Sequence, residues 1–206
     1  MSERAHPDDP SFREGWRLRR LWGFIPWLQR RENSYRRAVI WRYNWADRHC
    51  QGKRVLDIPC GMGWGTSLIG SAASVVGMDI SPDAVAEARH RYGQRIRFEV
   101  GSMAALDFPD SSLDVVCCLE GIEHVPVEVG RKFLDESRRV LAPGGTLLLS
   151  SPYCRVRAHS GNPYHIHEYG PEEIRSEVER NFVIDEVIER DVDILRILYI
   201  RATRRP

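Results

Sequence analysis

The stretch from residue 55 to residue 65 constrains the fold of this chain more than any other. A short apolar run with the sequence VLDI leads through Pro59 into the glycine-rich segment CGMGWG. A short apolar run bounded by turn residues is typical of a buried strand. Gly61 and Gly63 lack a Cβ, so a ligand can approach the backbone closely there. Asp57 ends the run, and ligands bind at the carboxyl ends of strands in open α/β sheets. The stretch therefore predicts an α/β fold with a ligand-binding turn.

The first alternative for such a turn is a dinucleotide site. The fingerprint G-x-G-x-x-G requires a glycine where this chain has Thr66, and a pyrophosphate would lie beside the carboxylate of Asp57. The segment instead resembles motif I of the class I S-adenosylmethionine (SAM) methyltransferases, a hydrophobic strand followed by an acidic residue and G-x-G-x-G. Pro59 replaces the first glycine of that motif. Since proline has no N–H and fixes φ near about −65°, this position needs neither a positive φ nor a donated hydrogen bond.

A second expected strand, residues 74–79, ends at Asp79, sixteen positions after Gly63. An acidic residue near this spacing meets ribose hydroxyls in nucleotide-binding α/β folds, and a carboxylate can accept from both hydroxyls. The alternative is a local cap before Ser81, which is a good helix N-cap residue. Given motif I upstream, ribose binding is the favoured interpretation.

The same resemblance places the loop after a third strand, residues 96–100, against the adenine. The family commonly has Asp or Asn where this chain has Ser102, so hydrogen bonding to the adenine is expected to be weaker or mediated by water. Met103 is expected to pack on the ring, and a core position is the alternative. The residues that the resemblance assigns to SAM are Asp57, Pro59, Gly61, Gly63, Asp79, Ile80, Ser102, Met103 and Glu120.

Residues 120–124, with the sequence EGIEH, follow the fourth expected strand and are candidates for acceptor chemistry. A short helix there would put Glu120 on one face with Glu123 and His124. Two carboxylates and an imidazole can hold a divalent ion. The pattern resembles the metal motif of the small-RNA 2′-O-methyltransferases and of the ubiquinone-biosynthesis O-methyltransferases. That resemblance implies Mg²⁺ or a similar ion that chelates oxygens of the acceptor.

A second polar segment, residues 162–169, follows the fifth expected strand. In the RNA enzymes a histidine from this region completes the metal site, and by that analogy His165 is preferred over His167. The predicted metal ligands are Glu120, Glu123, His124 and His165. Without a metal, His124, His165 or His167 is the expected general base, because imidazole titrates near neutral pH. The segment also resembles a loop of bacterial methyltransferases that act on sugars or polysaccharide precursors.

Strands and helices alternate through most of the chain, and the sequence RVLAPGG at residues 139–145 resembles the segment before strand five of the family. These features predict a Rossmann-like α/β fold of the class I methyltransferases, of the small single-domain, type 11 kind. The expected sheet has seven strands, mostly parallel with an antiparallel last strand, and helices on both faces. A helix from Gly63 to Ser71 is expected to follow the glycine-rich turn. Residues 1–50, rich in Arg and Trp, are expected to form a helical lid or extension, and residues 51–206 the SAM-binding core.

The composition argues against several classes of protein. A hydrophobic fraction of 42% and a charged fraction of 29% are typical of a globular domain. No apolar run approaches the roughly 20 residues of a membrane span, and no signal peptide is recognised, so a cytoplasmic location is expected. Five cysteines without a C-x-x-C pair suggest neither a disulfide framework nor a zinc site. A net charge of +1 argues against a nucleic-acid-binding surface without excluding one.

The sequence thus predicts an O-methyltransferase that transfers a methyl group from SAM to a hydroxyl of a small molecule or of a sugar or glycan, with or without a divalent metal. Either a monomer or a homodimer is expected. One alternative is methylation of RNA ribose or of another nucleic acid, favoured by the Arg-rich first fifty residues and by EGIEH. A second alternative is a SAM-binding regulatory subunit without catalytic activity.

Overall fold

The computed structural model describes residues 26–154, 159–192 and 195–206, and side chains from residue 36 onward within those ranges except that of residue 192. The first half of the expected lid therefore lies outside the described residues. The helices are α2 (Pro26–Asp47), α3 (Pro82–Tyr92), α4 (Val127–Val140) and α5 (Pro171–Glu179), with 3-10 turns η1 (Thr66–Leu68) and η2 (Ile122–His124). The strands are β1 (Arg54–Asp57), β2 (Ser74–Asp79), β3 (Arg97–Val100), β4 (Leu113–Leu119), β5 (Leu141–Cys154), β6 (Phe182–Val192) and β7 (Leu195–Arg204).

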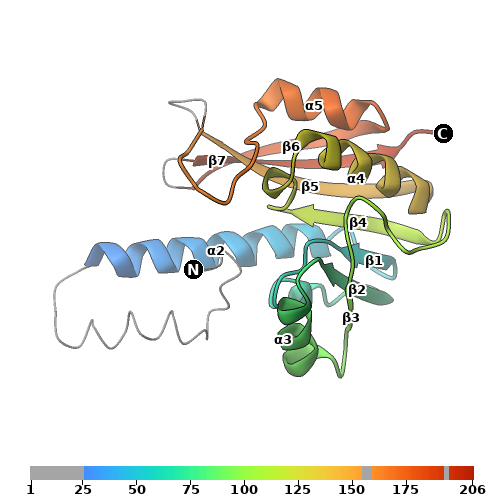
Figure 1. Cartoon of the computed structure of the whole chain (residues 1–206), viewed down its shortest axis with the longest axis horizontal. Helices are drawn as coiled ribbons and strands as arrows, with labels where there is room; N and C mark the ends of the chain where they lie inside the picture. Colours follow the sequence, from blue (N-terminus) through green and yellow to red (C-terminus); the bar gives the residue numbers. More distant parts are fainter. Residues whose placement is uncertain (1–25, 155–158, 193–194) are drawn as a thin grey trace.

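The seven strands form one sheet in the order β3-β2-β1-β4-β5-β7-β6 (Figure 1). The first five pair in parallel, as the alternation of strands and helices predicts. β7 is antiparallel to both of its neighbours, β5 and β6. The predicted fold class, a mostly parallel sheet with an antiparallel last strand, is confirmed. The strand order changes direction between β1 and β4, and ligands bind at such a point in doubly wound sheets.

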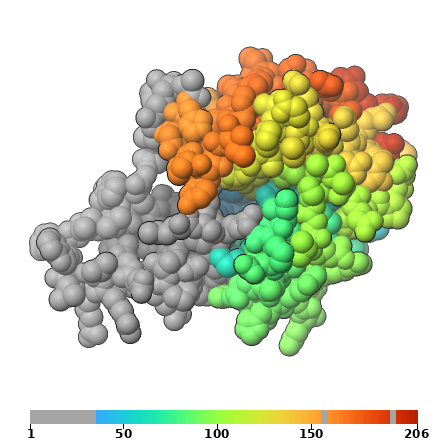
Figure 2. Space-filling view, in the orientation of Figure 1, coloured from blue at the N-terminus to red at the C-terminus, as the bar shows by residue number. Residues whose placement is uncertain are grey.

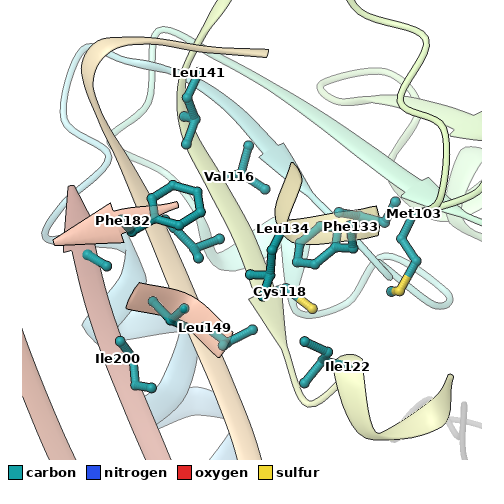
Figure 3. Close-up of a cluster of buried hydrophobic side chains, with 14 of the residues drawn as sticks. Met103, Val116, Cys118, Ile122, Phe133, Leu134, Leu141, Leu149, Phe182 and Ile200 are labelled. Carbon is teal, nitrogen blue, oxygen red and sulfur yellow. The ribbon is translucent and has the colours of Figure 1, made fainter. Parts of the chain in front are cut away.

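Each face of the sheet has its own apolar core, because successive side chains of a strand point to opposite faces. Leu56 and Ile58 face the larger core, beneath α4 and α5. Figure 3 shows Val116 of β4, Phe133 of α4 and Phe182 of β6 among the side chains of that core. Val55 faces the other core, which α2 covers. Asp57 has the same parity as Val55 and thus points toward α2.

The second half of α2 is part of the protein core. Trp45 and Ala46 are almost fully buried, and Trp41 and Trp45 contact the ring of Tyr199 on β7 edge to face. Although α2 has 22 residues, arginines interrupt its apolar positions. Within the described part of the chain, no helix is both long enough and apolar enough to cross a membrane.

The helix expected from Gly63 to Ser71 is wrong, because the structure has only the 3-10 turn η1 in this stretch. Gly63 has φ +79°, outside the helical region. The hydroxyl of Ser67 donates to the carbonyl of Trp64, and such local side-chain bonds compete with a helix. The ring of Tyr43 on α2 also lies directly against Gly65, so α2 occupies the space beside this turn.

Candidate active site

A cavity of about 720 Å³ lies at the carboxyl ends of β1, β2, β3 and β4, where α2 and the segment after β5 also contribute to its wall. Its volume is within the range of small-molecule sites, roughly 300–1,000 Å³. Figure 2 shows the segment after β5, in orange, on the surface next to the yellow of α4. The cavity brings together most of the residues that the sequence assigns to SAM: Pro59, Gly61, Asp79, Ile80, Ser102, Met103 and Glu120.

Asp79 is held rigidly at the end of β2. One carboxylate oxygen accepts from the backbone N–H of Gly61 at 2.9 Å, and the other accepts from that of Ser81 at 2.9 Å. An ionised carboxylate has about four acceptor sites, so acceptor capacity remains for a diol. Asp79 thus caps the turn locally and also lines the cavity, and its binding of ribose stays a prediction.

The part of the cavity wall that follows β2 and β3 has a mixed surface. Ile80 is 65% exposed, whereas Met103 is buried, and both line the cavity. The hydroxyl of Ser102 accepts a hydrogen bond from the backbone N–H of Ala104 at 3.2 Å. An apolar side chain beside a short polar one can hold a flat heterocycle.

Asp57 lies behind the wall of the cavity, where it holds neighbouring side chains in place. It is fully buried and is not among the residues that line the cavity. One of its oxygens accepts from the hydroxyl of Thr66 at 2.6 Å and from that of Tyr43 at 3.2 Å. Burial raises the pKa of Asp57 to about 7, although both hydrogen bonds lower it. Burial also raises the pKa of Tyr43 well above its usual value, so Tyr43 remains a donor.

The three glycines of the turn have different roles. Gly61, with φ +54°, lines the cavity and presents its backbone. Gly63 does not line the cavity; a Cβ there would lie 2.8 Å from the ring of Phe98 and 2.9 Å from Ala88. A Cβ on Gly65 would lie 2.1 Å from the ring of Tyr43. Gly61 and Gly65 both line the cavity, whereas Gly63 allows α3 and β3 to pack closely and Gly65 allows α2 to do so.

Glu120 adopts a left-handed backbone conformation, with φ +58°. Such a conformation in a residue with a Cβ costs about 1–3 kcal/mol and is often found at functional sites. Its carboxylate accepts from the hydroxyl of Ser150 at 2.8 Å and lies 3.8 Å from the guanidinium of Arg42. The carboxylate therefore interacts with β5 and α2, and it is not part of the group of possible ligands that includes Glu123.

Glu123, His124 and His165 converge in the cavity. Each offers one ligand atom, and these atoms all lie within 4.8 Å of one another. His124 is oriented by a contact of 2.9 Å between its Nδ1 and the carbonyl oxygen of Tyr164. The carbonyl of Glu123 accepts from the backbone of Ile166, which ties the segment after β5 to η2. Three of the four predicted metal ligands are thus adjacent, and Glu120 is separate.

His165 is surrounded by polar groups of its own segment. Its Nδ1 lies 2.5 Å from an oxygen of Glu168, and its Nε2 lies 2.9 Å from the amide nitrogen of Asn162. Burial raises the pKa of Glu168, but hydrogen bonds from Ser160 and His165 outweigh this effect and leave it below the usual value. His167 pairs with Glu173 at 2.7 Å and does not line the cavity. His165 is therefore better placed than His167 for acceptor chemistry.

Sequence reasoning missed two residues of α2, Arg42 and Tyr43. Both are buried, and both line the cavity. Both residues lie in the segment that was expected to be helical. In a segment with many arginines, however, the sequence does not indicate that Arg42 in particular is buried. The only available hint is that Tyr43 and Ala46 lie on the apolar face of that helix.

Residues 55–145 match the family described as methyltransferase domain. A probable SAM-dependent methyltransferase of Mycolicibacterium smegmatis is 36% identical over 154 residues, which is 72% of this chain and 55% of that protein. The ubiquinone biosynthesis O-methyltransferase of Burkholderia vietnamiensis is 35% identical over 117 residues, covering 53% of this chain and 50% of the other. This chain spans about half the length of these curated relatives.

Solved structures agree with the fold. The N-methyltransferase NodS from Bradyrhizobium japonicum has a TM-score of 0.69 at 15% identity, covering 84% of this chain and 98% of the other. At that identity the likeness concerns the fold alone. Together with the matched family and the relatives, it shows that this chain carries a class I SAM-dependent methyltransferase domain.

Proposed function

We propose that the protein is a SAM-dependent O-methyltransferase that acts on a hydroxyl of a small molecule or of a sugar or glycan. One observation carries the proposal: Glu123, His124 and His165 converge in the same cavity as Asp79 and Gly61. Groups that can activate a hydroxyl therefore lie beside the expected cofactor site. Methyl transfer from a sulfonium is an in-line displacement, for which alignment of the acceptor and its activation are the main requirements.

The cofactor is proposed to bind along the carboxyl ends of β1, β2 and β3. Asp79 would accept from the ribose hydroxyls, and Ile80 and Met103 would pack on the adenine. Among the described residues, Arg42 is the arginine that lines the cavity, and its guanidinium suits the carboxylate of the methionine part. This orientation leaves the polar cluster around Glu123 for the acceptor.

His165 is proposed as the general base, and His124 as a neighbour that orients the acceptor. The ring centroids of the two histidines are 5.2 Å apart. A base within hydrogen-bond reach of the acceptor hydroxyl takes its proton as the oxygen attacks the methyl group. The carbonyl of Tyr164 fixes the His124 ring, so a hydroxyl between the two histidines would meet groups that are already oriented.

The same three side chains also fit a divalent metal. One carboxylate and two imidazoles are a set that suits Mn²⁺, Fe²⁺, Co²⁺ or Zn²⁺ better than Mg²⁺, which prefers oxygen ligands. The three ligand atoms lie within 4.8 Å of one another, so Glu123, His124 and His165 would hold such an ion after closing around it. When bound, the ion would lower the pKa of the acceptor hydroxyl.

The acceptor side of the cavity is both polar and apolar. Val125 and Val129 line it beside the histidines, and Tyr164 is 44% exposed at its wall. The similarity to the Burkholderia O-methyltransferase of ubiquinone biosynthesis supports a hydroxyl of an organic small molecule as the acceptor. The glycan alternative depends on the resemblance of residues 162–169 alone.

The proposal is tested in two stages. Isothermal titration with S-adenosylhomocysteine is expected to show binding, and its absence would refute the proposed cofactor. A panel of phenols, sugars and RNA is then assayed with radiolabelled SAM, and His165→Ala is expected to abolish transfer without changing cofactor affinity. Exposed His90→Ala is the matched control. Transfer to RNA alone would contradict the acceptor class, and activity that resists EDTA would exclude the metal.

A further inference from the structure

The segment after β5 contacts both ring nitrogens of His165. The side chain of His165 is almost completely buried, and so is that of Glu168, which contacts Nδ1. Asn162 contacts Nε2 at 2.9 Å. Two neighbours on opposite sides of one imidazole can determine which nitrogen carries the proton, because a neutral ring has one donor and one acceptor.

The orientation of the Asn162 amide is defined by a third group. Its Oδ1 accepts from the backbone N–H of Tyr164 at 3.0 Å. If the amide were turned over, its NH₂ group would face that N–H, and two donors would meet. The NH₂ group therefore faces His165, and an amide NH₂ can only donate. It follows that Nε2 of His165 carries a lone pair.

Glu168 leads to the same conclusion from the other side of the ring. One of its oxygens accepts from the backbone N–H of Ser160 at 2.7 Å, and the other accepts from the Ser160 hydroxyl and faces Nδ1 of His165. A carboxylate that only accepts requires a proton on Nδ1. The two contacts, with Asn162 and with Glu168, are independent and agree on one tautomer.

We infer that Glu168 and Asn162 are positioning residues, which fix His165 as the neutral Nδ1–H tautomer, in which Nε2 carries the lone pair. An acceptor hydroxyl is a donor like the Asn162 amide, so it can replace that amide at Nε2. A divalent ion requires the same lone pair. The use of Nε2 in methyl transfer rests on the proposed function, whereas the tautomer does not.

The test is a ¹⁵N–¹H spectrum of histidine side chains in the full chain at neutral pH, without cofactor, acceptor or metal. The unprotonated nitrogen of His165 is expected to be Nε2, and a proton on Nε2 in the wild type would overturn the inference. In Glu168→Ala and in Asn162→Ala, the two nitrogen resonances of His165 are expected to move toward each other as the tautomers exchange.

Exposed Glu172→Ala, on α5, is the matched control and should leave the spectrum unchanged. A spectrum like the wild type in both Glu168→Ala and Asn162→Ala would also overturn the inference, because neither residue would then set the tautomer. If one variant does not fold, the wild-type spectrum and the spectrum of the other variant still test the tautomer of His165. The measurement needs no turnover, so a failed methyl-transfer assay and a wrong tautomer are separate results.

Discussion

Gly65→Ala tests whether α2 packs tightly against the glycine-rich turn of residues 61–65. Gly65 has φ −60° and ψ −49°, an ordinary right-handed conformation, so alanine meets no backbone strain there. The added Cβ would lie 2.1 Å from the buried ring of Tyr43. Overpacking of this kind costs about 1–3 kcal/mol. Displacement of the ring would also break the hydrogen bond from Tyr43 to Asp57, which contributes about 1 kcal/mol. The free energy of unfolding is therefore expected to fall by about 2–4 kcal/mol.

Urea unfolding measures the change, with the slope compared between variants to confirm that the transition is the same. Gly70→Ala is the matched control, because no atom lies within 4 Å of a Cβ at that position. In a Tyr43→Ala background the ring is absent, so Gly65→Ala should cost little, and the double-mutant cycle isolates the clash. A loss below about 0.5 kcal/mol, or equal losses at Gly65 and Gly70, would refute this packing argument.

Three further predictions concern the cofactor site. Because burial raises the pKa of Asp57 to about 7, above roughly 3.9 in an unfolded chain, the folded state binds more protons between these values. Asp57 therefore lowers the free energy of unfolding as pH rises from about 4 to 7, by at most about 1.4 kcal/mol per pH unit. Urea unfolding at several pH values should show that Asp57→Asn lacks this decline. An unchanged decline in the variant would contradict the raised pKa of Asp57. Arg42→Ala should weaken the binding of S-adenosylhomocysteine about tenfold, which corresponds to a loss of about 1.4 kcal/mol, as measured by calorimetry. The control Arg36→Ala, on the exposed face of α2, should leave this binding unchanged. Ser102→Asp should tighten that binding several-fold, by about 1 kcal/mol, because a carboxylate reaches further than a hydroxyl while still accepting from Ala104; weaker binding would show that this loop does not meet the adenine.

The sheet is well encoded in local sequence. The strand expected at residues 74–79 matches β2 at both ends, and the antiparallel β7 follows the family order. These elements are legible because apolar runs, turn residues and the acidic strand ends recur at short range. Asp57 illustrates the limit: alternation along β1 shows that its side chain shares a face with Val55, but not that α2 covers this face.

The acceptor site depends on contacts that local sequence does not encode. The spacing of EGIEH suggested one helical face, but the positive φ of Glu120 turns its carboxylate toward Ser150 and Arg42. Asn162 and Glu168 look like ordinary residues of a polar loop. Their importance follows only from the fold of residues 159–168 around His165.

The contact between Tyr43 and Gly65 has a consequence for how related sequences should vary. A larger residue at position 65 and a full-sized aromatic ring at position 43 exclude each other sterically, and the hydroxyl of Tyr43 matters only while position 57 is acidic. The three positions should therefore change together during divergence, although 43 and 65 lie far apart in the chain. A relative with alanine at position 65 and tyrosine at position 43 would need a displaced α2. Helix α2 and the glycine-rich turn of residues 61–65 are thus expected to be inherited as one unit.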